Sequence, residues 1–314
     1  MEKQKTKVAA VEKVEAAVVQ NMDAAETAVE IGRDEYGRTI VAVPNFDLAQ
    51  IAASGQCFRM EPVGPVFCLV ARGRYVELAQ AGPGRVVFSC DEEEVRTVWA
   101  DYFDLGFDYG AVVRQLEKGA DPFLREAAAF GHGIRILRQE PFETLVSFLI
   151  SQNKNIPAIK RSIDALCRGF GERSTGFGFD GRPVEFYSFP TPEALAETSL
   201  DELRATGVGY RDAYLQSAAR AVASGTIDLE ALRDLPGPET IRALLAFHGV
   251  GEKVAHCVAL FAYHHLDSCP VDVWIARVLD QVYGGRFDWS CHGGVCGLVQ
   301  QYMFYYIRNG YSSK

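Results

Sequence analysis

Residues 38–90 alternate short apolar runs with turns that contain glycine and proline. Apolar runs of this length, separated by such turns, are typical of β-strands joined by hairpins. The pattern predicts an antiparallel sheet with strands at 39–43, 58–63, 66–71, 75–79 and 86–90. Residues 1–37 carry only a weak helical pattern, and we expect them to form a flexible tail.

From residue 91 onward the apolar positions recur with the period of amphipathic helices. Helices are predicted at 142–150, 236–247, 274–283 and 294–309, and another carries Val254, Cys257, Val258 and Phe261 on one face. Residues 171–190 are rich in glycine and phenylalanine, and we expect them to form an exposed connection. The predicted fold class is α+β, with an antiparallel β-sheet domain at 38–135 and an all-helical domain at 136–314.

Composition limits the classes of protein to which the chain can belong. Apolar residues make up 48% of its 314 residues, and no apolar run reaches the roughly 18 residues of a membrane span. The formal net charge of −9 argues against a protein held on nucleic acid by bulk charge. The eight cysteines form no Cys-x2-Cys pair, which argues against a zinc ribbon, and free thiols are typical of an intracellular protein.

A glycine turn at 249–251 comes directly before a lysine at the start of a predicted helix. Two glycines one residue apart allow a tight turn and let backbone N–H groups approach a ligand. The positive end of a helix disfavours the ammonium form of Lys253, and a neutral amine is a nucleophile. One helix and a return loop can bring the carboxylate of Asp272 back to this amine. In the simpler interpretation Lys253 is solvated and Asp272 only caps the next helix.

The run Gly-Val-Gly-x-Lys, a short helix and then Pro-Val-Asp-Val resembles the helix-hairpin-helix DNA glycosylases that use a catalytic lysine and aspartate. Within that superfamily the chain is most similar to the 8-oxoguanine DNA glycosylase/AP lyases, since segments 54–59, 133–155 and 300–304 also resemble theirs. The resemblance implies a bifunctional enzyme of base excision repair that flips 8-oxoguanine out of duplex DNA, excises it and cuts the strand by β-elimination. Lys253 would attack the sugar, and Asp272 would stabilise the positive charge that develops on it.

The resemblance also assigns residues to a base pocket and to DNA contacts. The base pocket would contain Gly55, Cys257, Gln300 and Phe304. The DNA contacts would come from Asn153, Tyr210, Arg211, His248, Gly249 and Gly251. The Gly55 carbonyl would accept from N7–H of 8-oxoguanine, a donor that guanine lacks. Tyr210 and Arg211 would both be exposed. Tyr210 would replace the stacking lost when the lesion leaves the duplex, and Arg211 would hydrogen-bond the base left unpaired on the opposite strand.

The chain departs from the family at two of these places. Ala158 stands where the family usually has an arginine, five residues after Asn153, so we expect relaxed selectivity for cytosine opposite the lesion. Trp274 stands where relatives often have a histidine that touches a phosphate. Related endonuclease-type enzymes end in a cysteine cluster that holds an iron–sulfur centre, whereas this C-terminal region has only Cys291 and Cys296. We expect neither a metal ion nor a cofactor.

Two other functions fit parts of the pattern. A monofunctional alkylated-base DNA glycosylase shares the two-part build, but such enzymes usually lack the hairpin lysine. A non-catalytic helix-hairpin-helix protein that only binds DNA would need more positive charge to neutralise phosphates. The expected partner is double-stranded DNA containing 8-oxoguanine, bound by a monomer that contacts no membrane. The expected location is intracellular, with the DNA, in the cytoplasm of a prokaryote or the nucleus of a eukaryote.

Overall fold

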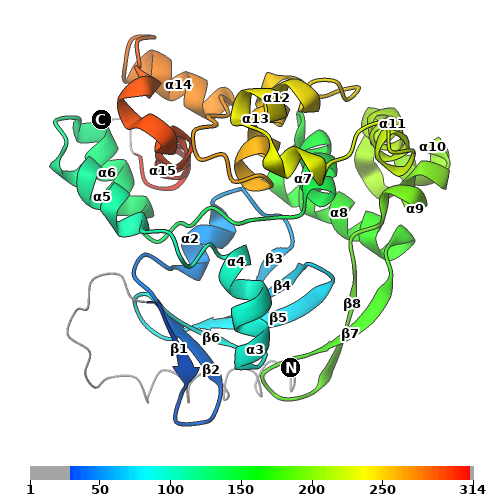
Figure 1. The fold of residues 1–314 in the computed structure, drawn as a ribbon, viewed down its shortest axis with the longest axis horizontal. Coiled ribbons are helices and arrows are strands. Elements are labelled where there is room, and N and C mark those ends of the chain that lie inside the picture. The colour runs from blue at the N-terminus through cyan, green and yellow to red at the C-terminus, as the bar shows by residue number, and fades with distance from the viewer. Residues whose placement is uncertain (1–28, 312–314) are drawn as a thin grey trace.

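A computed structural model describes residues 29–311, and Figure 1 shows its main sheet on one side of the molecule with most of the helices on the other. Within these residues the six strands of that sheet are antiparallel and follow the order β1-β2-β6-β5-β4-β3. The strands are β1 (Glu30–Arg33), β2 (Thr39–Ala42), β3 (Met60–Val63), β4 (Val66–Ala71), β5 (Arg74–Gln80) and β6 (Arg85–Phe88).

Strands β2 to β6 confirm the apolar runs, and β4 occupies the predicted residues. Strand β1 is a correction, because it lies inside the stretch that we expected to be a tail. Its one large apolar residue, Ile31, pairs with Val41 of β2, so the neighbouring strand defines an element that the sequence pattern does not mark. The remainder of the expected tail, residues 1–28, lies outside the described part of the chain.

Helices occupy most of the chain after β6. Short ones are α2 (Leu48–Ala53), α3 (Glu92–Glu94), α4 (Ala100–Tyr102), α9 (Pro192–Glu197) and α10 (Leu200–Leu203). Longer ones are α5 (Tyr109–Lys118), α6 (Pro122–Gly131), α7 (Pro141–Ser151), α8 (Ile156–Phe170), α11 (Asp212–Ala223), α12 (Gly237–Leu244), α13 (Glu252–Phe261), α14 (Val273–Gln281) and α15 (Cys296–Asn309). Helices α7, α12, α13, α14 and α15 confirm the predicted ones. None of the helices in residues 29–311 combines the length and apolar character needed to cross a membrane.

Residues 171–190 are more than the connection that we expected. They form a second, two-stranded sheet from β7 (Arg173–Phe177) and β8 (Pro183–Tyr187). This hairpin packs on β5, where the rings of Tyr75 and Phe186 stack with centroids 6.1 Å apart. Positions along β7 alternate only between exposed and half-buried, so no apolar run marks the strand in the sequence.

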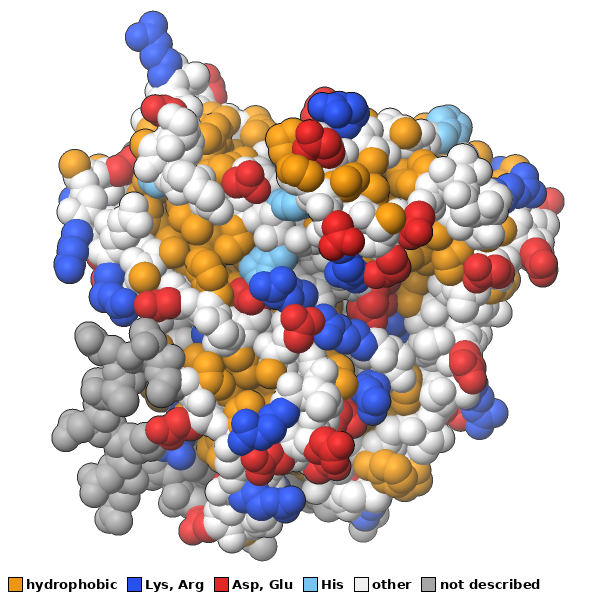
Figure 2. Space-filling view, in the orientation of Figure 1, with side chains coloured by type: hydrophobic (Ala, Val, Ile, Leu, Met, Phe, Trp, Pro, Cys, Tyr) orange, Lys and Arg blue, Asp and Glu red, His pale blue; other side chains and the backbone are white. Residues whose placement is uncertain are grey.

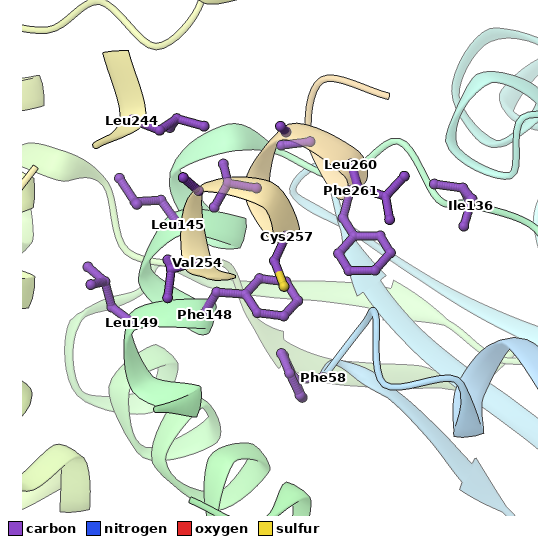
Figure 3. Close-up of a cluster of buried hydrophobic side chains, with 14 of the residues drawn as sticks. Phe58, Ile136, Leu145, Phe148, Leu149, Leu244, Val254, Cys257, Leu260 and Phe261 are labelled. Carbon is purple, nitrogen blue, oxygen red and sulfur yellow. The ribbon is translucent and has the colours of Figure 1, made fainter. Parts of the chain in front are cut away.

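A buried aromatic cluster fixes α13 against α7 (Figure 3). The Phe148 ring of α7 stacks on the Phe261 ring of α13, with centroids 5.5 Å apart. Phe58, which follows the turn after α2, meets the edge of the Phe148 ring at 5.6 Å. Aromatic pairs at such separations contribute about 0.5–1.5 kcal/mol beyond their burial. The cluster therefore sets the relative positions of three segments that also carry predicted site residues.

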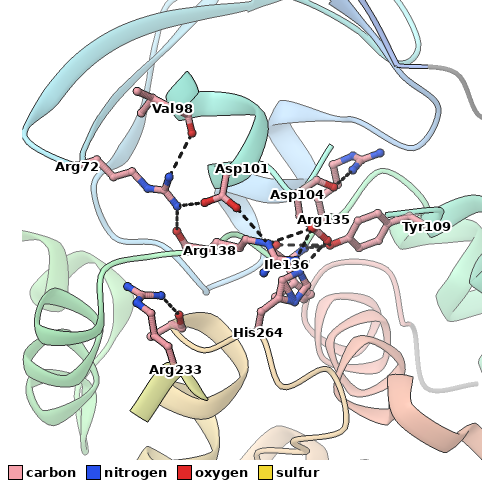
Figure 4. A network of polar contacts seen from close by, with 11 residues as sticks. Arg72, Val98, Asp101, Asp104, Tyr109, Arg135, Ile136, Arg138, Arg233 and His264 are labelled. Atoms are coloured by element: carbon pink, nitrogen blue, oxygen red, sulfur yellow. Dashed lines mark hydrogen bonds and ion pairs between the residues drawn. The ribbon is translucent and has the colours of Figure 1, made fainter. Parts of the chain in front are cut away.

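A buried polar network joins the segment after α4 to the loop after α13 (Figure 4). The Asp104 carboxylate accepts from Arg138 Nη2 at 2.9 Å and from the Tyr109 hydroxyl at 2.9 Å. His264 Nε2 lies 2.7 Å from Asp104 Oδ2, and burial lowers the pKa of this histidine to about 4. Arg135 Nη1 donates to the Asp104 carbonyl at 2.6 Å. The network ties the loop that leads to Asp272 to the sheet side of the molecule.

Candidate active site

A cleft of about 810 Å³ gathers residues from the turn after α2, the α7–α8 loop and helices α13, α14 and α15. The predicted site residues that line it are Gly55, Asn153, Lys253, Asp272 and Phe304. Five positions spread over the chain therefore meet in one depression. Positively and negatively charged side chains are intermixed on the face shown in Figure 2, and they form no bulk positive patch there. The cleft is therefore the more specific indication of a binding site.

Lys253 lies in the first turn of α13, where Gly251 is the N-cap residue in extended conformation. Val254 and Cys257 of the same helix are buried, and Cys257, four residues after Lys253, shares its face of α13. The Lys253 amine lies 3.4 Å from Ser151 Oγ and 5.0 Å from the centroid of the Phe148 ring. The amine therefore contacts a hydroxyl, an aromatic face and the thiol of Cys257, and it lines the cleft where a ligand can reach it.

Asp272 begins α14 and serves as its N-cap. Its Oδ1 accepts from the backbone N–H groups of Trp274 at 3.0 Å and Ile275 at 2.9 Å. The simpler interpretation of this residue is thus correct as far as it goes. Both bonds fall on the same oxygen, however, and the residue also lines the cleft. The cap fixes the carboxylate without engaging Oδ2, which is the arrangement that an orienting or charge-stabilising group requires.

The thiol of Cys257 lies near both Lys253 and Asp272. It is 4% exposed, and burial raises the pKa of its thiol, with Lys253 opposing that rise and Asp272 adding to it. The thiol is therefore neutral, and the side chains of Lys253 and Asp272 both lie close enough to affect it. A neutral, buried sulfur behaves as a small apolar group, and its role as one face of the base pocket stays a prediction, because Cys257 is not among the residues that line the cleft.

Gly55 and Phe304 meet at the opposite wall. Gly55 has φ +79°, and a Cβ at this position would lie 3.1 Å from the Phe304 ring, so a side chain here would be strained and crowded. Gln300 is 3% exposed on the same helix, and its Oε1 has no hydrogen-bond partner among the described residues. An unsatisfied buried amide oxygen is costly unless a ligand supplies the donor. Gly55 and Phe304 are brought together as predicted, whereas Gln300 is not among the residues that line the cleft, so its place in the base pocket stays a prediction.

Gln301 is a residue of this wall that the sequence pattern did not reveal. Its Nε2 donates to the Ser54 carbonyl at 2.5 Å, which ties α15 to the turn that carries Gly55. Gln56 reinforces the same turn, because its Nε2 donates to Arg135 O at 2.9 Å. Of the adjacent glutamines, Gln301 therefore holds the wall, whereas Gln300 keeps a buried acceptor with no partner among residues 29–311. A glutamine pair gives no sequence signal of this division.

Asn153 and Tyr210 project from two loops that lie side by side. Asn153 has φ +50°, and its Nδ2 is 3.4 Å from the Tyr210 hydroxyl. Tyr210 is 56% exposed, an unusual state for a large aromatic side chain. Gln152 links these loops to the glycine hairpin, because its Nε2 donates to the Gly249 carbonyl at 3.2 Å. These hydrogen bonds link the three predicted DNA-contacting segments into one surface, here called the lip, of which the α7–α8 loop lines the cleft.

Arg211 is a correction. We expected it to be exposed beside Tyr210, but it is only 6% exposed. Its Nη1 donates to the Val208 carbonyl at 3.0 Å, and its Nη2 donates to the Gln152 carbonyl. The guanidinium carbon also lies 4.4 Å from the centroid of the Tyr210 ring. In this conformation the hydrogen bonds of Arg211 hold the 207–211 turn and the α7–α8 loop together. A contact between Arg211 and a partner base would require these bonds to break.

The hairpin residues occupy the edge of the same lip. His248 is exposed, and its ring meets the Tyr214 ring at 4.8 Å. Gly249 has φ +86°, whereas nothing lies within 4 Å of a Cβ built on Gly251. The structure contains no DNA, so their contacts to phosphate stay predictions. Trp274, which stands where relatives often have a histidine, lines the cleft two residues after Asp272.

Ala158, which stands where the family usually has an arginine, lies in the first turn of α8. Its N–H donates to the side chain of the N-cap residue Asn155 at 3.0 Å. A methyl group cannot reach across the lip to a partner base as an arginine could. The structure is therefore consistent with a missing contact at this position.

Two family models match consecutive parts of the chain. Residues 39–145 match the N-terminal domain of 8-oxoguanine DNA glycosylase. Residues 146–288 match the HhH-GPD superfamily of base excision DNA repair proteins. The chain belongs to the 8-oxoguanine DNA glycosylase family. Its activity is that of this family, an 8-oxoguanine glycosylase/lyase acting on DNA in base excision repair.

Individual relatives of this glycosylase agree with the family models. An N-glycosylase/DNA lyase of Saccharomyces cerevisiae is 39% identical over 162 residues, which are 48% of this chain and less than half, 42%, of the yeast protein. A probable N-glycosylase/DNA lyase of Methanothermobacter thermautotrophicus is 31% identical over 235 residues, covering 66% of this chain and 72% of that protein.

A solved structure extends the likeness to the fold. It is the 8-oxoguanine glycosylase/lyase of Clostridium acetobutylicum in complex with double-stranded DNA containing cytosine opposite to 8-oxoguanine. It is 34% identical, with a TM-score of 0.80, and the match covers 90% of this chain and 97% of the other. The matched regions include both the sheet side and the helical side of the molecule.

Proposed function

We propose that this glycosylase binds double-stranded DNA containing 8-oxoguanine as a monomer, with Lys253 as its nucleophile and Asp272 as its charge-stabilising carboxylate. The observation that carries the proposal is that both residues line one cleft, together with Gly55 and Phe304. Each is fixed by its own helix start, Lys253 in the first turn of α13 and Asp272 as the cap of α14. The positions that the resemblance assigns are therefore held by ordinary secondary structure.

In the first chemical step the Lys253 amine, as the free base, attacks C1′ of the extruded nucleotide. The bond from C1′ to the base breaks, and 8-oxoguanine leaves with the electron pair and takes up a proton. The carboxylate of Asp272 stabilises the positive charge that develops on the sugar, with Oδ1 held by two helix N–H groups. Opening of the sugar ring gives a Schiff base on Lys253. Loss of a proton from C2′ then expels the 3′ phosphate by β-elimination.

The base pocket would recognise the lesion by its edge and its faces. The Gly55 carbonyl would accept from N7–H, and guanine would present a repelled acceptor there instead. Phe304 and Cys257 would cover the two ring faces, and the unsatisfied Gln300 Oε1 would accept from the Watson–Crick edge. Asn153 and the exposed Tyr210 ring would occupy the vacated stack.

Sodium borohydride trapping on an 8-oxoguanine duplex tests the proposal. The expected result is a covalent protein–DNA adduct together with free base and a strand cut 3′ to the lesion. Asp272→Asn should slow base release by at least about a hundredfold while DNA binding persists. Base release without an adduct would instead indicate the monofunctional alternative. Binding with neither product would indicate a non-catalytic DNA-binding protein.

The absence of an arginine at position 158 predicts relaxed selectivity for the partner base. An arginine fork that hydrogen-bonds one partner base gives about 1–3 kcal/mol of discrimination, and Ala158 cannot supply it. Excision rates on duplexes with cytosine, adenine, thymine or guanine opposite the lesion should therefore differ by less than in Ala158→Arg. A strict cytosine preference in the natural chain would contradict this prediction.

A further inference from the structure

Arg308 lies at the base pocket, although no sequence pattern pointed to it. It follows Phe304 by four residues on α15, and its guanidinium carbon is 5.1 Å from the centroid of the Phe304 ring. It also lines the cleft together with Gly55. Residues four apart share one face of a helix, so Arg308 and Phe304 point in the same direction.

One nitrogen of this side chain lacks an acceptor. Arg308 Nη1 is buried, and it has no hydrogen-bond partner among residues 29–311. The same atom lies 3.8 Å from a Cβ built on Gly55, beside the turn whose carbonyl we assign to lesion recognition. A guanidinium keeps its charge at every physiological pH, so it cannot escape the cost of burial by losing a proton. An unpaired charged donor is among the costliest groups to bury, unless a ligand supplies the acceptor.

We propose that Arg308 is a specificity-determining residue whose Nη1 donates to O8 of the extruded 8-oxoguanine. This inference rests on the proposed function, because it takes the lesion to lie against Gly55 and Phe304. The five-membered ring of 8-oxoguanine carries a donor, N7–H, next to an acceptor, O8. The Gly55 carbonyl and the Arg308 guanidinium form the complementary acceptor and donor, side by side. Guanine has neither N7–H nor O8, so it offers neither the donor nor the carbonyl acceptor of this pair.

A phosphate group is the other acceptor in DNA that an arginine commonly binds. Phosphates stay at the solvent-facing surface of the duplex, whereas Arg308 Nη1 is buried behind the Phe304 ring. A base carbonyl enters the pocket and reaches such an atom. The burial of Nη1 therefore favours the base over the backbone.

The test measures binding in a Lys253→Gln background, so that chemistry does not consume the substrate. Affinities are determined for three matched duplexes that contain 8-oxoguanine, guanine or a tetrahydrofuran abasic-site analogue. Arg308→Met keeps most of the side-chain stem over Phe304 but removes the donors. The expected result is that the ratio of affinity for 8-oxoguanine to affinity for the abasic analogue falls by at least about tenfold, the effect of one charge-assisted hydrogen bond.

Arg277→Met is the matched control, because Arg277 also lies over an aromatic ring, that of Trp274, at 4.8 Å. Its ratio should stay within about twofold of the parent. An unchanged ratio in Arg308→Met overturns the proposal, and so does an equal loss on all three duplexes, which would indicate a phosphate contact. Arg308→Lys, which keeps the charge but not the fork, provides a second variant and should show a smaller fall. If the protein with Lys253 intact forms no borohydride adduct, the proposed function itself has failed.

Discussion

The chain contains the pattern Gly-Val-Gly-x-basic twice, at 207–211 and at 249–253. Both turns begin with a glycine at positive φ, +83° for Gly207 and +86° for Gly249. They differ at the second glycine. Gly251 is extended at φ −103° and caps α13, whereas Gly209 stays at φ +63°. The two basic side chains therefore leave their turns in different directions.

The partners of those side chains decide what each can do. Arg211 is buried and donates to the carbonyls of Val208 and Gln152, so its hydrogen-bonding capacity serves the fold. Lys253 faces a cleft, and its contacts are a long one to the Ser151 hydroxyl at 3.4 Å and one to the Cys257 thiol, neither of them a backbone carbonyl. A basic residue whose donors meet backbone carbonyls is structural, and one that faces a cleft with weak partners is free for chemistry. The motif alone does not distinguish these outcomes.

The largest expected effect separates the two basic residues. Lys253→Gln should lower adduct formation and strand cutting by at least about a thousandfold, because it removes the nucleophile. Arg211→Gln should keep the covalent step and instead lower the free energy of unfolding by about 1–3 kcal/mol, since two carbonyls lose their donor. Trapping yield and urea denaturation measure the two quantities. Loss of trapping in both variants at equal folded concentration would remove the distinction.

Substitution of the two hairpin glycines should show which one requires its conformation. Gly249→Ala should lower the free energy of unfolding by about 1–3 kcal/mol, because Gly249 has positive φ and its added Cβ would lie 2.5 Å from the Tyr214 ring. Gly251→Ala meets no atom within 4 Å and should stay within about 0.5 kcal/mol of the parent. Urea denaturation measures both. Equal losses would show that the second glycine is also conformationally required.

A further expected effect concerns Tyr210, the exposed aromatic residue of the 207–211 turn. Tyr210→Ala should weaken binding to a lesion duplex by about 1–3 kcal/mol, the usual worth of one stacking contact. Tyr210→Phe keeps the ring and should bind nearly as well, because the hydroxyl has only a long contact with Asn153 at 3.4 Å. Fluorescence anisotropy with labelled DNA measures both affinities. A loss in Tyr210→Phe as large as in Tyr210→Ala would assign the contribution to the hydroxyl.

The sequence pattern predicted those helices and strands whose own residues carry a clear apolar pattern. Apolar alternation marked β2 to β6, and the spacing of Val254, Cys257 and Phe261 marked α13. Strand β1 and the β7–β8 hairpin escaped prediction because they are specified by their neighbours, for example by the pairing of Ile31 with Val41. These strands contain too few apolar residues to form a recognisable pattern.

The same limit applies to the candidate site. The resemblance named Lys253, Asp272 and the pocket residues, and the fold brings most of them to one cleft. It also led us to expect an exposed Arg211, because exposure depends on segments far away in sequence, here the Gln152 carbonyl. Arg308 and Gln301 had no sequence signal, since a single long polar residue on a helix is usually solvated. Only tertiary packing shows that both reach the turn at Gly55.

The identity of the trapped amine tests the central claim most directly. The borohydride-reduced adduct is digested with protease and nuclease, and the modified peptide is sequenced by mass spectrometry. The account predicts that the sugar fragment is attached to Lys253, in the peptide that begins α13. Attachment to any other lysine, or to the N-terminal amine, in the wild-type protein would contradict it.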